Sequence, residues 1–254
     1  MRTASPTGLR RVEHCMGTVF SIDVRTPDAD PAAIDEVVTW LHWVDRTFST
    51  YRETSEISRL DRNAISLDDC SPDVVEVLRR CAELADDTEG YFDCHNDGRL
   101  DPSGYVKGWA IERASDLLTT AGAGDHCVNG GGDVQCAGAP APDRSWHVGI
   151  AHPLRPATTI ATVEGRDLAV ATSGTAERGR HIVDPHTGER PDRFASITVV
   201  GRRIAGVDAY ATAAFAMGER APAWLTARGL SALLVRPDGS VLRTPSAGVV
   251  NSGS

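Results

Sequence analysis

Apolar residues either alternate with polar ones or recur every three to four positions through most of this chain. Residues 16–25 (MGTVFSIDVR) alternate and are rich in β-branched side chains, so they predict a strand. Residues 30–49 instead carry apolar side chains at helical spacing, namely Ile34, Val37, Val38, Leu41 and Val44. Ser71 followed by Pro72 is typical of a helix start, and residues 105–122 carry a third helical pattern. The first half is therefore predicted to be mainly helical.

The second half is dominated by short strand patterns. A strand, a glycine turn and a strand are expected in residues 126–138, and further strands in 146–153, 158–165, 167–174 and 195–201. Helices are expected at 207–218 and 222–229, before a hairpin at 231–243. Because the predicted helices cluster in the first half of the chain and the strands in the second, we expect an α+β fold with mixed sheets flanked by helices. We expect a lead-in at 1–14, a single domain at 15–243 and a flexible tail at 244–254.

Composition narrows the function classes. The 254 residues are 41% hydrophobic and 24% charged, with a net charge of -9 and no basic run, so nucleic acid is an unexpected partner. No apolar run approaches the ~18–20 residues of a membrane helix, and no signal-peptide pattern precedes the domain, so we expect a cytoplasmic protein without a membrane span. The six cysteines include no C-x-x-C pair, which favours free thiols over disulfides or a zinc site.

The only lysine of the chain is Lys107, within LDPSGYVKGWAIERA at residues 100–114. It falls near the start of a predicted helix, where the helix field disfavours a cation. An anion or a polar ligand against the ammonium would explain it, although a single lysine in an arginine-rich chain also has to fall somewhere. Asp101 and Ser103 stand just before the same helix, where helix capping is the simpler explanation.

Three other segments could carry chemistry, each with a structural alternative. The glycines of NGGGDV, at residues 129–134, could form a phosphate nest or merely a tight turn; they fit neither the Rossmann nor the Walker pattern. His181 and Asp184, in HIVDPHTGERP, suit a general base, although a lone histidine is more often structural. Asp208 and Thr212 are four apart on one helix face and offer hard oxygen ligands for Mg²⁺, or else a helix cap and a buried hydroxyl.

Taken in order, these segments resemble the FAD:protein FMN transferases, the ApbE-like flavin transferases. The resemblance runs from MGTVF through FSTYRETSEISRL, GYFD, LDPSGYVKGWAIERA, VNGGGDV, WHVGI, AVATSG and HIVDPHTG to VDAYATAAFAMG, covering roughly residues 16–218. It implies cleavage of FAD with release of AMP, and Mg²⁺-dependent attachment of FMN to a threonine or serine of an acceptor protein that carries a short threonine-containing segment.

The resemblance also implies roles for individual residues. His181 would be the base that deprotonates the acceptor hydroxyl. The carbonyl of Gly104 would join Asp208 and Thr212 around the metal. The residues expected to contact the flavin nucleotide are Met16, Tyr51, Asp101, Lys107, Gly131, Gly132, Asp133, Ser173 and Ile182.

The chain departs from the family pattern at two places. After GYFD the family more often continues with Pro-Thr, whereas this chain has Cys94, His95, Asn96 and Asp97. Ala211 stands where some relatives carry a second acidic metal ligand, so a two-metal site is in doubt. Two further functions stay open: a FAD pyrophosphatase that yields free FMN and AMP, and a flavin-binding module without turnover.

Overall fold

The computed structural model describes residues 8–96, 98–175 and 182–244. Helices in this part of the chain are α1 (Ala32–Phe48), α2 (Glu56–Asp61), α3 (Pro72–Asp87), α4 (Ser103–Thr120), α5 (Ile204–Met217) and α6 (Ala221–Ala227). Short 3₁₀ turns lie at Leu67–Asp69 and Gly218–Arg220. No helix of these residues is long and apolar enough to cross a membrane.

One large sheet organises the molecule. It has the order β1-β2-β5-β6-β9-β10-β11-β12, and two-stranded ribbons are formed by β3-β4 and by β7-β8. The strands are β1 (Leu9–Cys15), β2 (Thr18–Val24), β3 (His95–Asn96), β4 (Arg99–Leu100), β5 (His126–Gly130), β6 (Asp133–Ala137), β7 (Trp146–Ala151), β8 (Thr159–Gly165), β9 (Leu168–Gly174), β10 (Ser196–Gly201), β11 (Ser231–Val235) and β12 (Val241–Arg243).

The predicted α+β class is confirmed, but the prediction of mixed sheets is wrong. Every strand pairing among the described residues is antiparallel. Five of these pairings, β1-β2, β3-β4, β5-β6, β7-β8 and β11-β12, are hairpins, and a short turn can only join antiparallel strands. The sequence pattern placed the strands without indicating how they pair.

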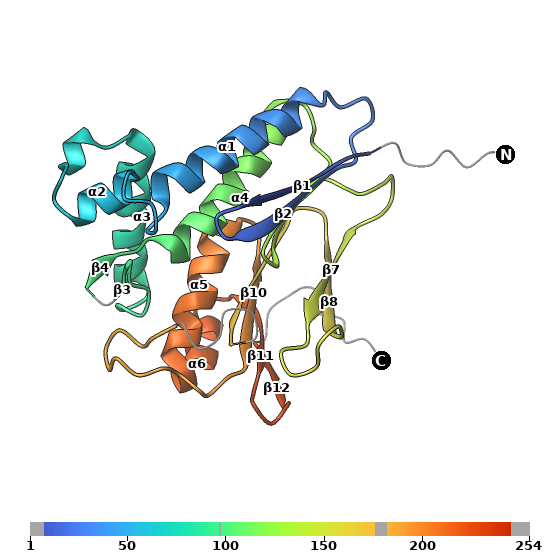
Figure 1. Ribbon diagram of the computed structural model, residues 1–254. Helices are drawn as coiled ribbons and strands as arrows, with labels where there is room; N and C mark the ends of the chain where they lie inside the picture. Colours follow the sequence, from blue (N-terminus) through green and yellow to red (C-terminus); the bar gives the residue numbers. More distant parts are fainter. Residues whose placement is uncertain (1–7, 97, 176–181, 245–254) are drawn as a thin grey trace.

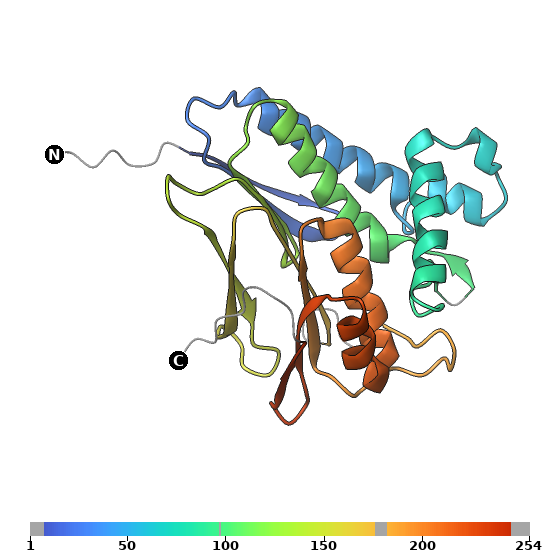
Figure 2. The same cartoon turned by 180° about the vertical axis from the view of Figure 1, so that it is seen from behind.

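The large sheet separates two hydrophobic cores. Helices α1, α4, α5 and α6 cover one face, where α4 and α5 lie side by side, while the β7-β8 ribbon lies on the opposite side (Figures 1 and 2). Side chains along β9 alternate between the two cores: Ala169 and Ala171 belong to the core on the helix side, and Leu168 and Val170 belong to the core on the ribbon side. The ribbon thus shields a sheet face that would otherwise expose apolar side chains to water.

Strand β1 was not predicted. It pairs with β2 over its whole length, although all but its last residue belong to the stretch expected to be a lead-in. Its sequence, LRRVEHC, is mostly polar and mostly exposed, with Val12 60% exposed. Charged side chains on an edge strand discourage pairing with another chain, and they also remove the hydrophobic alternation by which a strand is recognised.

The six cysteines form no disulfide in this structure, and Cys15, Cys81 and Cys136 are buried.

Candidate active site

A cavity of about 810 Å³ opens where the N-terminal half of α4, the β5-β6 turn, the end of β9 and helix α5 meet. The β7-β8 ribbon contributes residues 147–151, and the loop at residues 182–185 supplies more of the lining. This volume lies near the upper end of the roughly 300–1,000 Å³ typical of small-molecule and cofactor sites. Ten of the residues expected from the sequence line it: Asp101, Gly104, Lys107, Gly131, Gly132, Asp133, Ser173, Ile182, Asp208 and Thr212.

Lys107 joins two buried carboxylates from different parts of the fold. Its Nζ forms an ion pair with Asp133 at the start of β6 and lies 3.6 Å from Oδ2 of Asp208 on α5. Asp133 is 1% exposed and Asp208 is 3% exposed, so both charges lie deep in the cavity wall. The expected anion beside Lys107 is therefore present as protein carboxylates. One ammonium thus bridges two buried carboxylates that belong to different elements.

The carboxylate of Asp133 is fixed by the neighbouring strand. Its Oδ1 accepts a hydrogen bond of 3.0 Å from the backbone N–H of Thr172. The ladder between β6 and β9 has its last pair at Val134 and Val170, so this side chain satisfies a strand N–H just beyond the ladder. The other oxygen is thereby directed at Lys107.

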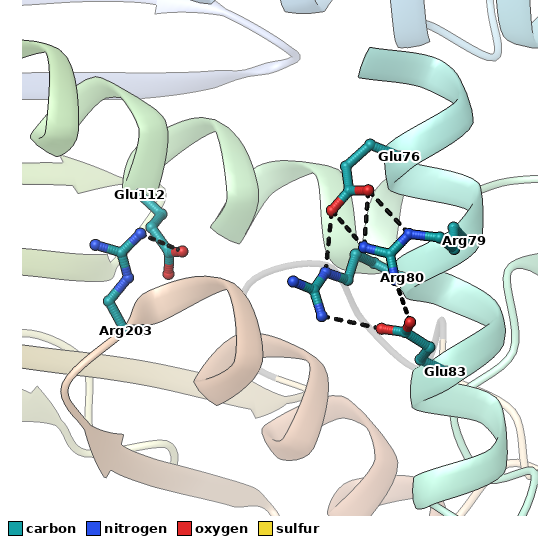
Figure 3. Close-up of polar contacts among 6 residues, drawn as sticks. All are labelled: Glu76, Arg79, Arg80, Glu83, Glu112 and Arg203. Atoms are coloured by element: carbon teal, nitrogen blue, oxygen red, sulfur yellow. Dashed lines mark hydrogen bonds and ion pairs between the residues drawn. The ribbon is translucent and has the colours of Figure 1, made fainter. Parts of the chain in front are cut away.

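The start of α5 is tied down by two distant side chains. Gln135 accepts a 3.0 Å hydrogen bond from the backbone N–H of Ile204, and Glu112 accepts one of 3.1 Å from Ala205. Glu112 also pairs with Arg203 at 2.8 Å (Figure 3). A carboxylate at a helix N-terminus is favourable because it satisfies unpaired amides and complements the helix dipole. These contacts set the position of α5 one turn before Asp208.

Glycine at position 108 allows α4 and α5 to approach closely. A Cβ atom at Gly108 would lie 2.9 Å from Cβ of Asp208, 3.0 Å from the carbonyl oxygen of Ile204 and 3.1 Å from Cα of Ala205. Any larger side chain would have to push α5 away. Because Lys107 precedes Gly108 directly, this contact also sets how closely the ammonium approaches Asp208.

Hydroxyl groups line the cavity next to the carboxylates. The Oγ of Ser173 and the Oγ1 of Thr212 are 3.2 Å apart and link β9 to α5. Thr212 lies one turn after Asp208 on the same face of α5, and Gly104 lies on the cavity wall formed by α4. This set of a carboxylate, hydroxyls and a backbone carbonyl consists of the hard oxygen donors that Mg²⁺ prefers. Ala211 is fully buried and supplies no ligand atom there.

The structure supports the tight-turn interpretation of NGGGDV. Gly131 and Gly132 form the turn between β5 and β6 with φ of 59° and 90°, which glycine adopts readily. Their amides already donate within the chain, to the carbonyl of Val19 at 3.1 Å and to Oδ1 of Asn129 at 3.0 Å. A Cβ at Gly130 would lie 2.5 Å from the ring of Phe20. The turn and the close packing therefore explain why glycine is needed at each of these three positions, although Gly131 and Gly132 also line the cavity.

Two expected flavin contacts lie outside the cavity lining. Met16 has a positive φ of 50°, and its backbone N–H donates to Asp45 at 3.1 Å. Tyr51 is 96% exposed. Their roles toward the flavin stay predictions. His181, the expected base, lies outside the described residues.

Sequence reasoning missed the residues that hold the site together. Glu112 and Gln135 are separated from their α5 partners by 93 and 69 residues, and neither belongs to a local motif. Their role emerges only once α4 and β6 are packed against α5. Thr172 was missed for a similar reason, because its contribution is a backbone N–H, which no residue type signals.

Comparison with known proteins identifies the family. The model of the ApbE family matches residues 16–96 and 94–234, which is most of the chain. This chain belongs to the ApbE family. An ApbE protein of Thermotoga maritima has the same fold, with a TM-score of 0.84 over 94% of this chain and 97% of that chain at 20% identity.

Among curated relatives, the chain is 34% identical over 157 residues to the FAD:protein FMN transferase of Rhodobacter capsulatus, a match that covers 58% of this chain. It is 31% identical over 131 residues to the FAD:protein FMN transferase of Vibrio cholerae, covering 47% of this chain. These matches span only 30% and 39% of the relatives' own lengths.

Proposed function

We propose that this chain transfers FMN from FAD to a threonine or serine hydroxyl of an acceptor protein, with release of AMP and with Mg²⁺ as the required metal. The observation that carries the proposal is the cavity in which Lys107, Asp133 and Asp208 meet the hydroxyls of Ser173 and Thr212. Two relatives of this ApbE chain are named FAD:protein FMN transferases, which indicates the substrates.

The residues present fit a magnesium ion. Asp208, Thr212 and the carbonyl of Gly104 would hold it, since all three lie on the cavity lining and offer oxygen donors. The carboxylate of Asp208 is 3% exposed and adds electrostatic attraction for a divalent cation. When bound, the ion supplies positive charge to the phosphoryl oxygens, which offsets the negative charge that develops on them during transfer.

The residues of the chain would position the reactants. The acceptor hydroxyl attacks the phosphorus on the FMN side of the pyrophosphate, a new P–O bond forms, and the bridging P–O bond breaks so that AMP leaves with the bridging oxygen. In such transfers positioning and electrostatic stabilisation supply most of the rate. Lys107 would hold Asp133 and Asp208 at the cavity wall, and the 19% of its side chain that stays exposed is accessible to the nucleotide.

A base is needed to accept the proton of the acceptor hydroxyl. We assign this role to His181, because histidine titrates near neutral pH and can contribute about 10²–10⁴ in rate. Its neighbour Ile182 and the nearby Asp184 both line the cavity, which supports the assignment.

The experiment is a transfer assay with the full chain, FAD, Mg²⁺ and an acceptor protein that carries a short threonine-containing segment. A fluorescent flavin band on a denaturing gel and an acceptor mass increased by one FMN group are expected. Asp208→Asn should abolish the transfer, because it removes the charge expected to hold the metal. The control is Asp86→Asn, since Asp86 is an exposed carboxylate on α3 outside the cavity. Free FMN without labelled acceptor would instead identify a pyrophosphatase, and intact FAD would identify a binding module.

A further inference from the structure

Three metal-binding side chains meet where the GYFD motif ends and the chain departs from its family. Asp93, Cys94 and His95 each offer one ligand atom, and these atoms lie within 4.8 Å of one another. Asp93 and His95 also line the cavity, next to the β3-β4 ribbon that His95 begins. None of the three belongs to the oxygen site around Asp208.

We propose that Asp93, Cys94 and His95 form a second metal site at the rim of the cavity, which binds a thiophilic divalent cation of the Zn²⁺ class. The ligands would be one carboxylate oxygen, the Cys94 sulfur and Nδ1 of His95. Because the site is built from different donor types, it would be independent of the magnesium site.

The distances between the ligand atoms suit a shared zinc ion. Tetrahedral bonds of the usual zinc lengths place sulfur and nitrogen about 3.6 Å apart, and nitrogen and oxygen about 3.3 Å apart. In this structure the Cys94 sulfur lies 3.9 Å from Nδ1 of His95, and Oδ1 of Asp93 lies 3.0 Å from the same nitrogen. Shifts of about 0.3 Å would bring these two contacts to zinc separations, and the sulfur and the carboxylate oxygen lie within 4.8 Å of each other.

The chemistry of the donors selects the metal. A thiolate and an imidazole favour Zn²⁺, whereas Mg²⁺ favours oxygen donors alone. Metal binding displaces the proton of the Cys94 thiol, because the thiolate is the form that binds the metal. A thiolate and a carboxylate together balance the charge of one divalent ion.

The site would act on the cavity through the backbone of its own loop. The carbonyl oxygen of Cys94 accepts a 2.8 Å hydrogen bond from the backbone N–H of Asp101, which is one of the cavity residues. Three protein ligands also leave one tetrahedral position open to water or to a bound molecule. A metal here would therefore anchor the rim next to the expected nucleotide contact at Asp101.

Metal titration tests the proposal without depending on the transferase activity. The reduced full chain, in excess Mg²⁺, is titrated with Co²⁺ as a spectroscopic probe and then with Zn²⁺. We expect one equivalent of Co²⁺ to produce a thiolate-to-cobalt charge-transfer band, and Zn²⁺ to displace it. Cys94→Ser should abolish the band, and His95→Gln should weaken Zn²⁺ binding roughly tenfold or more.

The control is Cys70→Ser, which removes a partly exposed thiol outside the cluster and should leave the titration unchanged. His95→Gln alters an exposed side chain, so it keeps the test valid even if Cys94→Ser fails to fold. Absence of the charge-transfer band in the native chain would overturn the proposal. A band that persists unchanged in Cys94→Ser would overturn it as well.

Discussion

Replacing Gly108 by alanine tests whether the contact between α4 and α5 builds the site. The added Cβ would meet Asp208, Ile204 and Ala205 at 2.9–3.1 Å, and two of these atoms belong to the backbone, so the strain cannot be relieved by turning a flexible side chain. The matched control is Gly206→Ala on α5, because a Cβ there would meet nothing within 4 Å. Both substitutions put alanine in a helix, and only one creates a clash.

The expected magnitudes separate the two variants. Alanine gains up to about 1 kcal/mol over glycine inside a helix. Overpacking at Gly108 should cost about 1–3 kcal/mol, which cancels or exceeds that gain. Gly108→Ala is therefore expected to be about 1–3 kcal/mol less stable than Gly206→Ala, which corresponds to roughly 2–12 °C in Tm for a chain of this size.

Thermal unfolding of both variants, followed by circular dichroism, gives this difference, and a fluorescence titration with FAD in the presence of Mg²⁺ gives its effect on the site. We expect Gly108→Ala to bind FAD more weakly, because moving α5 changes the position of Asp208 relative to Lys107. Equal Tm values together with equal FAD affinities would refute the account of how α4 and α5 position the site.

Three further results are expected. Lys107→Ala should destabilise the fold by about 3 kcal/mol, because it removes the ammonium that two buried carboxylates share. Mg²⁺ should raise the Tm of this variant more than that of the native chain, and an equal Mg²⁺ effect would contradict the charge argument. Glu112→Ala should cost about 1 kcal/mol of stability, because it removes the cap at the start of α5. Glu76→Ala should lower Tm much less, because its ion pairs on α3 are exposed (Figure 3), and comparable losses of Tm in the two variants would refute this contrast. Burial lowers the pKa of His126 below its usual 6.5, so below pH 6.5 the unfolded chain binds a proton that the folded chain does not. Stability should therefore fall as the pH drops from 6.5. Parallel curves of Tm against pH for the native protein and His126→Gln would disprove this role of His126.

The sequence predicted the elements better than their arrangement. Helical spacing in residues 30–49 and the Ser71-Pro72 start both correspond to observed helices, because each signal is local. Strand β1 lacked such a signal, since its edge position requires polar residues rather than alternating apolar ones. The antiparallel pairing could not be predicted either, because alternation of apolar and polar residues shows which face of a strand is buried and not which strand is its neighbour.

In the candidate site, too, the residues with a local signal were predicted and those that act through distant contacts were not. Lys107 stood out because a cation near a helix start needs an explanation, and the structure provides one in Asp133 and Asp208. The residues that fix those carboxylates act through backbone amides far away in the sequence, so no spacing could indicate them. Tyr51 is almost fully exposed, and its expected contact with the flavin stays a prediction.

The central claim is that this cavity transfers FMN from FAD to a protein hydroxyl. The most direct measurement is the ratio of AMP released to FMN attached, determined by chromatography and acceptor mass in the same reaction with Mg²⁺. The account predicts one AMP for each FMN attached, and loss of both products in Asp208→Asn. Release of AMP with free FMN and an unmodified acceptor would contradict it.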